Sequence, residues 1–372
     1  MSDKATIIAI AASFLFVLYL LPLPKVSSTH RFSFIIYPTA FFILGLVLVK
    51  IAVPDQQKIS IEPRISGLYN NIDLQIEKFN TSTQYKNFIL ISGGSLCNRG
   101  IDPEQLQNAL KDKQYKSLVT QICLPGANHF ERNNILEYAE KTLTTKLSRK
   151  ANVIFLREAF QYYDNVPLAQ LKKHPDQRTI AYMDLYNSIN AIITGLSVDI
   201  NNEKHKTTPS HIIGVIRSSI MNISHIGLVD RFSFNGDIYN GYTPLFEPIE
   251  HTPVSKNQVQ HALDLTSNTP NEIIKIPNWV FKYTYQPNNK PVYDAVINFI
   301  TPTLHNAALT YFYAICKSSD VSCLNDPTLA ATIKKLEDNK FWYDSGDHLL
   351  QEGAKISTSW LATSLISRNV LK

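Results

Sequence analysis

The chain has 372 residues, enough for one large domain or two smaller ones. Charged residues make up only 18% of it, and its 13 glycines and 19 prolines are too few for a low-complexity or collagen-like chain. Residues 54–372 hold 32 basic and 30 acidic side chains. This part is therefore nearly neutral, which excludes the basic surface of a nucleic-acid-binding protein.

Two uncharged stretches near the amino terminus are long enough to cross a membrane. Residues 5–24 (ATIIAIAASFLFVLYLLPLP) and 32–49 (FSFIIYPTAFFILGLVLV) contain no charged side chain, and a helix needs about 20 apolar residues to span a bilayer. A cleaved signal peptide is the alternative for the first stretch. No A-x-A-like cleavage site follows it, however, and the second apolar run begins almost at once. We therefore predict a membrane anchor of two transmembrane helices in residues 1–53.

The charges around these stretches predict how the anchor is oriented. The loop between them carries Lys25 and Arg31, whereas the amino-terminal tail carries Lys4 beside Asp3. By the positive-inside rule the loop lies in the cytoplasm. Everything after residue 53 is then expected on the extracytoplasmic side of the membrane.

Downstream of the anchor, the hydrophobic pattern predicts an α/β domain. Residues 54–86 are polar and weakly patterned, which is typical of a connector. Short apolar runs then alternate with amphipathic segments, the pattern of a parallel sheet covered by helices on both faces. We predict strands at 87–92, 116–123 and 152–156, and helices at 101–113 and 130–147.

The second half of the chain interrupts this rhythm and then resumes it. A helix is predicted over residues 178–200, and residues 201–290 are rich in Asn, Thr, Pro and His, as in a long irregular insertion. A strand at 292–300 and helices at 305–316, 328–338 and the carboxyl terminus follow. We therefore expect one domain over residues 87–372, with an insertion at about 201–290.

Groups suited to acyl transfer follow the predicted strands. Active groups in open α/β sheets gather beyond the carboxyl ends of the strands. Ser95 follows two glycines after the first strand, and His348 lies near acidic residues close to the carboxyl terminus. A serine becomes a nucleophile when a histidine takes its proton and a carboxylate orients that histidine. Each group alone also fits a plain structural role, since a serine after two glycines is usually only a turn.

Three segments resemble the sequence blocks of the SGNH (GDSL-like) hydrolase and acyltransferase superfamily, in particular its membrane-anchored bacterial branch. The segment ISGGSLCNRGIDPEQL resembles the first block, LPGANHFE the second and FWYDSGDHLLQEGA the last. They occur in the order of the family, and the resemblance covers residues 88–368. Where the family's first triplet usually has Asp or Ser, this chain has Gly94. The resemblance implies an SGNH-like three-layer sandwich with a mostly parallel sheet.

The resemblance also implies roles for individual residues. Ser95 is the expected nucleophile, His348 the base and Asp344 the acid that orients it. The backbone amides of Ser95 and Gly126 are the expected oxyanion donors, and Asn165 stands in for the donor of the third block, whose Gly-x-Asn-Asp motif is absent.

Two nearby residues leave alternatives open. The family acid usually lies three residues before the histidine, a position that Ser345 occupies here, so Asp347 is an alternative to Asp344. His305 follows a predicted strand and either approaches the site or begins a helix.

The cysteines and histidines bear on compartment and cofactors. Two disulfides would suit an oxidising compartment, and four unrelated buried thiols are an equally open interpretation. Cys316 and Cys323 are close enough in sequence for a small loop to join them, whereas their spacing is not that of a zinc site. The five histidines between residues 205 and 261 lack metal-ligand spacing. We expect no metal and no cofactor.

Two functions of different classes follow. The first is a serine esterase or O-acyltransferase in the bacterial inner membrane, with its catalytic domain outside the cytoplasm. Its expected partners are an ester substrate or acyl donor, an envelope polysaccharide or lipid, and the bilayer. The second is a catalytically degenerate SGNH-like protein that assists a membrane acyltransferase.

Overall fold

The computed structural model describes residues 63–127, 129–159, 238–249, 253–267, 292–317, 322–324 and 327–372. The chain divides into two compact units, one of residues 1–66 and 168–236 and the other of residues 67–167 and 237–372. The described residues belong almost entirely to the second unit, and the fold below is that of this unit.

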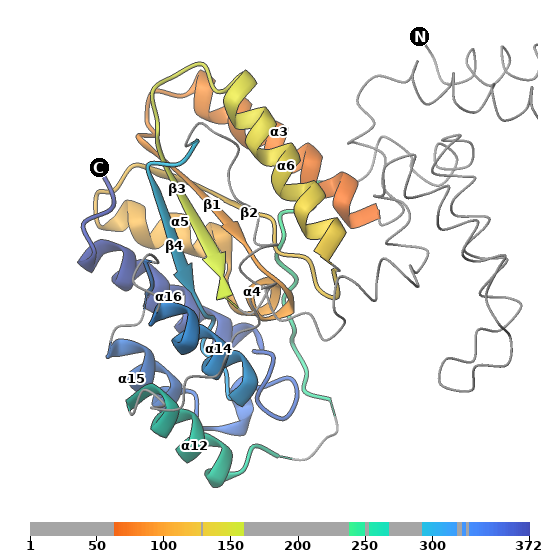
Figure 1. Cartoon of the computed structure of the whole chain (residues 1–372), viewed down its shortest axis with the longest axis vertical. Helices are drawn as coiled ribbons and strands as arrows, with labels where there is room; N and C mark the ends of the chain where they lie inside the picture. Colours follow the sequence, from red (N-terminus) through yellow and green to blue (C-terminus); the bar gives the residue numbers. More distant parts are fainter. Residues whose placement is uncertain are drawn as a thin grey trace, which may run out of the picture. The chain divides into compact units, whose positions relative to one another are not determined.

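The described residues form an α/β fold around a four-stranded parallel sheet (Figure 1). The strands lie in the order β2-β1-β3-β4, so the chain builds the sheet outward from β1 in one direction and then in the other. The point at which the order reverses is the gap between β1 and β3, where ligands of open α/β sheets usually bind. The strands are β1 Asn87–Ser92, β2 Ser117–Gln121, β3 Asn152–Glu158 and β4 Ala295–Phe299.

Helices cover both faces of this sheet (Figure 1). On one face lie α3 (Pro63–Thr81) and α6 (His129–Lys146), where the ring of Phe79 meets that of Phe88 on β1 edge-on at 5.8 Å. The main hydrophobic core fills the other face. The helices on that face are α5 Pro103–Asp112, α14 Asn306–Cys316 and α16 Gln351–Ser367, with α12 Lys256–Ser267 and α15 Thr328–Lys335 packed beyond them.

Burial on both faces explains why residues 88–91 of β1 are all apolar. All six of its residues are buried, and Ile89 and Ile91 face the main core while Phe88 faces α3. An alternating pattern would place polar side chains in one of the two helix layers. The predicted strands and the helices between them are therefore found close to the expected positions.

The structure differs from the sequence interpretation in two segments. Residues 63–81, within the predicted connector, form α3, whose buried side chains include Leu68, Ile72 and Phe79. Within the insertion predicted at 201–290, residues 256–267 form α12, which packs on α14 and α15. In α12 the apolar stripe is accompanied by Lys, Asn and Gln on the exposed side, whereas in α3 Asn71 is buried within the stripe and Leu74 is exposed.

Within the described ranges, no helix is long and apolar enough to cross a membrane. The two membrane helices predicted for residues 1–53 lie outside those ranges, as does the predicted helix at 178–200.

Candidate active site

The predicted nucleophile lies at the turn after β1. Gly93 and Gly94 end the strand, and Ser95, which is partly exposed, is the first residue of the short helix α4 (Ser95–Gly100). A Cβ at Gly93 would lie 2.5 Å from Cys97 Cβ and 2.6 Å from Glu158 Oε2, so only glycine fits there. The close approach of these neighbours fixes the path of the backbone that presents Ser95.

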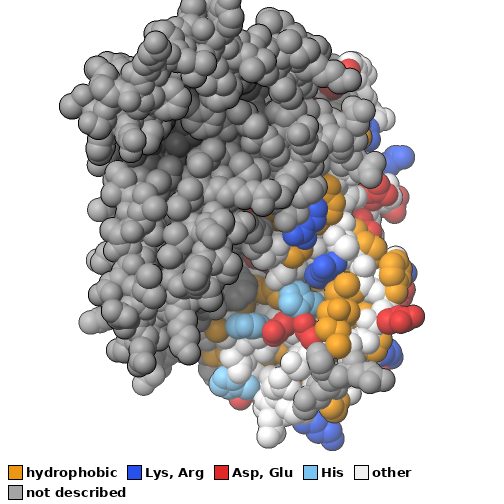
Figure 2. Space-filling view, turned by 90° about the vertical axis from the view of Figure 1, so that its right-hand side faces the viewer, with side chains coloured by type: hydrophobic (Ala, Val, Ile, Leu, Met, Phe, Trp, Pro, Cys, Tyr) orange, Lys and Arg blue, Asp and Glu red, His pale blue; other side chains and the backbone are white. Residues whose placement is uncertain are grey.

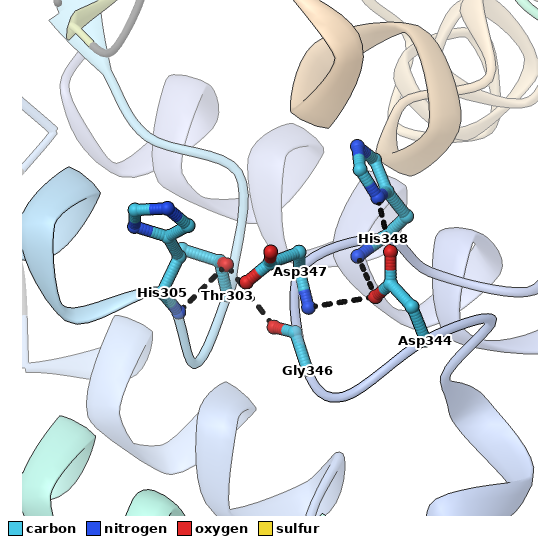
Figure 3. A network of polar contacts seen from close by, with 6 residues as sticks. All are labelled: Thr303, His305, Asp344, Gly346, Asp347 and His348. Atoms are coloured by element: carbon cyan, nitrogen blue, oxygen red, sulfur yellow. Dashed lines mark hydrogen bonds and ion pairs between the residues drawn. The ribbon is translucent and has the colours of Figure 1, made fainter. Parts of the chain in front are cut away.

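Asp344 and His348 form a hydrogen-bonded pair in the loop before α16 (Figure 3). Asp344 Oδ2 lies 2.5 Å from His348 Nδ1, and both side chains are partly exposed. The second carboxylate oxygen, Oδ1, accepts the backbone N–H groups of Asp347 (2.9 Å) and His348 (2.8 Å). Because Oδ1 is held by two backbone donors, Oδ2 is left to accept the Nδ1 proton of His348.

These contacts determine the direction in which the pKa of Asp344 is shifted. Burial acts to raise the pKa of Asp344, but the hydrogen bonds from His348 and Asp347 and the attraction of His348 outweigh it, so the pKa is lowered overall. An ionised Asp344 holds the Nδ1–H tautomer of His348, which leaves the Nε2 lone pair to accept a proton.

Asp347, the alternative acid, has a different environment. Its carboxylate turns away from His348 toward Thr303 and His305 (Figure 3). Burial raises its pKa and the nearby Asp344 adds to this effect, while His305 and His348 act to lower it. Of the two acids, it is Asp344 whose carboxylate contacts the ring of His348.

His305 has a structural contact of its own. Its Nδ1 accepts the N–H of Ala308 at 3.1 Å, so the side chain caps the amino terminus of α14. Figure 2 shows histidine and acidic side chains gathered on one exposed face of the described part of the chain.

A buried carboxylate that the sequence interpretation missed lies directly behind the serine turn. Glu158, the last residue of β3, is fully buried, and its Oε2 accepts the N–H of Gly94 at 2.8 Å. Its Oε1 accepts the hydroxyl of Thr301 at 2.9 Å, and the N–H of Cys97 donates to the same carboxylate. Burial raises the pKa of Glu158, while these hydrogen bonds and the attraction of His348 oppose the rise.

The alternation of side chains between the two faces of each strand is the sequence feature that could have identified Glu158. Ile154 and Leu156 of β3 face the main core, so Glu158, two residues further on, faces the same side. By the same spacing, Gly93 follows Ile91 of β1 and Thr301 follows Phe299 of β4 on this side of the sheet. The three residues therefore meet at the carboxyl edge of the sheet, beside the β1–β3 gap.

Ser95 and His348 belong to this same edge. Glu158 accepts the amide immediately before Ser95, and His348 lies near enough that an imidazolium there would lower the pKa of Glu158. A Cβ at Gly100, at the end of α4, would lie 3.5 Å from Leu349 Cδ1, next to His348. Ser95 begins α4 and His348 lies just before α16, and these two helices pack together although the two residues are about 250 positions apart in the sequence.

The loop predicted to supply an oxyanion donor lies beside the serine turn. The N–H of Leu124 donates to the carbonyl of Gly93 at 3.1 Å, and a disulfide joins Cys97 of α4 to Cys123. We call this bond the α4 disulfide. Two residues beyond Leu124, Gly126 has φ +65°, and nothing lies within 4 Å of the position of a Cβ. Asn165, the other predicted donor, lies outside the described residues.

The second disulfide joins Cys316 at the end of α14 to Cys323. All four cysteines are therefore paired, which decides between the two interpretations that the sequence left open. Only the α4 disulfide lies next to the candidate site.

Part of the predicted insertion also lies against the site. Asn98 of α4, which is buried, donates to the carbonyl of Gly241 at 2.6 Å, and its own carbonyl accepts the N–H of Thr243 at 3.2 Å. Further along, the N–H of Ile249 donates to the carbonyl of Tyr343 at 2.8 Å. Residues 238–249 thus connect α4 to the loop that carries His348.

Comparison of the chain with protein-family models, curated proteins and solved structures found no match. Among the described residues, no group of three His, Cys, Asp or Glu side chains is placed to hold a metal ion.

Proposed function

We propose that this protein is a serine esterase or O-acyltransferase that uses Ser95, His348 and Asp344. The observation that carries the proposal is the 2.5 Å contact between His348 Nδ1 and Asp344 Oδ2 at the edge of the sheet where the Ser95 turn lies. A carboxylate held by two backbone N–H groups and paired with a partly exposed histidine is the arrangement that general-base catalysis needs. The resemblance of three sequence blocks to the SGNH hydrolases, with their three-layer sandwich, supports the same function.

In this mechanism His348 Nε2 takes the proton of the Ser95 hydroxyl as Oγ attacks the ester carbonyl. The backbone amides of Ser95 and Gly126 hold the oxyanion of the tetrahedral intermediate. His348 then gives its proton to the leaving alkoxide, and an acyl group remains on Ser95. Water or an acceptor hydroxyl, deprotonated by His348, attacks this acyl-enzyme and restores the serine, so hydrolysis and transfer differ only in the acceptor.

We further propose that the catalytic domain faces the extracytoplasmic side of the bacterial inner membrane. The two uncharged stretches in residues 1–53 and the basic loop between them support this location. Two disulfides also support it, because such bonds persist in oxidising compartments. An ester-bearing envelope polysaccharide or lipid is the substrate class that fits this location.

The test is labelling of the full-length chain, purified in detergent, with a fluorophosphonate probe. We expect wild type to be labelled at Ser95, as identified by peptide mass spectrometry, and Ser95→Ala and His348→Ala to remain unlabelled. Absence of wild-type labelling, or equal labelling of Ser95→Ala, would instead favour a catalytically degenerate partner of a membrane acyltransferase.

A further inference from the structure

The mechanism above leaves one buried ionisable group at the site without a role. Glu158 is fully buried at the end of β3, where a charge costs stability, and burial raises its pKa accordingly. Apolar residues of similar volume in place of buried charges are often neutral or stabilising. A contribution to stability is therefore a weak explanation for a carboxylate at this position.

The contacts of Glu158 converge on the serine turn. Two of its donors are the amides of Gly94 and Cys97, one on each side of Ser95 in the sequence. The third is the hydroxyl of Thr301 at 2.9 Å, which comes from the segment after β4. The carboxylate thus ties the turn after β1 to the ends of β3 and β4.

Helix α4 needs such support because it cannot hold its own amino terminus. It has only six residues, and the residue that precedes it, Gly94, has no side chain to cap it. The first amides of a helix have no partner within the helix. Glu158 supplies that partner from the buried side, while Ser95, between its two backbone donors, stays partly exposed.

We propose that Glu158, oriented by Thr301, is a positioning residue that holds the Gly94–Cys97 turn so that the Ser95 hydroxyl and amide keep their places relative to His348. The inference rests on the proposed function, because it assigns the geometry of the same nucleophile. Glu158 does not touch the substrate, since it is sealed beneath the turn.

The test measures the second-order rate constant and the final extent of fluorophosphonate labelling in full-length variants. The final extent reports the folded fraction, whereas the rate constant reports the placement of Ser95 in folded molecules. We expect Glu158→Ala to label about 10²-fold more slowly, the size of effect that a displacement of about 1 Å produces. Glutamine keeps an acceptor for the turn, and the Thr301 hydroxyl can rotate to accept from its amide, so Glu158→Gln is expected to stay within about threefold of wild type.

Two further variants keep the test decisive if Glu158→Ala fails to fold. Thr301→Val keeps the shape of the side chain and removes its hydroxyl, and we expect slower labelling, by about tenfold, at an unchanged final extent. Glu140→Gln is the matched control, because Glu140 is a buried glutamate on α6, on the other face of the sheet. It should label at the wild-type rate.

The inference is overturned if the alanine and valine variants label at the wild-type rate constant, or if glutamine is as slow as alanine, since the charge would then matter rather than the hold on the turn. Both outcomes require a wild type that is labelled at Ser95. They are therefore distinct from a failure of the proposed function, in which wild type itself is not labelled.

Discussion

Replacing Asp344 with asparagine tests the proposed acid with little change in shape. In wild type, Oδ1 of Asp344 accepts two backbone N–H groups, and Oδ2 accepts from His348 Nδ1. An asparagine keeps both backbone hydrogen bonds only if its carbonyl oxygen takes the place of Oδ1. Its NH₂ group then faces His348 Nδ1, which must become an acceptor, so the ring proton moves to Nε2. A protonated Nε2 has no lone pair with which to accept the proton of Ser95.

The structure sets the size of this effect. The opposite amide orientation would give up two hydrogen bonds from backbone donors, at a cost of about 2 kcal/mol. That cost lowers the population of the Nδ1–H tautomer of His348, which the mechanism requires, by about 30-fold, since each 1.36 kcal/mol is about a factor of ten. The loss of the negative charge that stabilises the imidazolium adds to this restriction. We expect Asp344→Asn to be labelled about 10³–10⁴-fold more slowly than wild type.

The assay is the rate of fluorophosphonate labelling at pH 7, with Asp347→Asn as the matched control. Asp347 donates its backbone N–H to Asp344, and a side-chain replacement leaves that contact intact. The control is expected to stay within about threefold of wild type, because the Asp347 carboxylate turns away from the ring of His348. Slow labelling of Asp347→Asn together with normal labelling of Asp344→Asn would refute the assignment and identify Asp347 as the acid.

The packing behind the serine turn predicts unequal effects of two alanine substitutions. Gly93→Ala is expected to destabilise the fold by about 1–3 kcal/mol in thermal unfolding because of the 2.5 Å approach to Cys97. Gly94→Ala, where the nearest atom is 3.9 Å away, should cost less than about 0.5 kcal/mol; equal losses would contradict the packing. Removing the α4 disulfide by a double alanine replacement should cost about 3–4 kcal/mol and slow the labelling. The same change at the second disulfide should leave the labelling rate unaltered. Glu158→Gln should gain stability relative to wild type as pH rises above 4.5, the ordinary pKa of a glutamate side chain, because the raised pKa of Glu158 disfavours its ionised form in the fold. Urea unfolding at pH 4 and pH 7 measures the gain, and an equal difference at both values would contradict its electrostatic origin.

The sequence predicted the sheet well because its strands are buried on both faces. NFILIS and NVIFL predict buried strands, since each is a short apolar run that ends at a turn or a charged residue. The same runs placed Ser95 at a strand end, and the loop before the last helix placed Asp344 near His348. Local pattern is sufficient where an element and its function share one stretch of chain.

Contacts between distant segments were beyond such a pattern. Glu158 directly follows Arg157, so this charged pair resembles the start of a loop rather than the end of a buried strand. Only the neighbouring strands show that the carboxylate meets Gly94 and Thr301. Helix α3 was missed for another reason, because the buried Asn71 and the exposed Leu74 break the spacing of its apolar residues.

Gly94, where the SGNH pattern that this segment resembles has Asp or Ser, lies directly before α4. An Asp or Ser at position 94 could cap α4 with its own side chain, as such residues do at helix amino termini. Gly94 makes no such cap, and the carboxylate that accepts its amide comes from Glu158, 64 residues further along the chain. A capping side chain at position 94 would accept the N–H of the second or third helical residue, and Glu158 accepts the N–H of the third, Cys97.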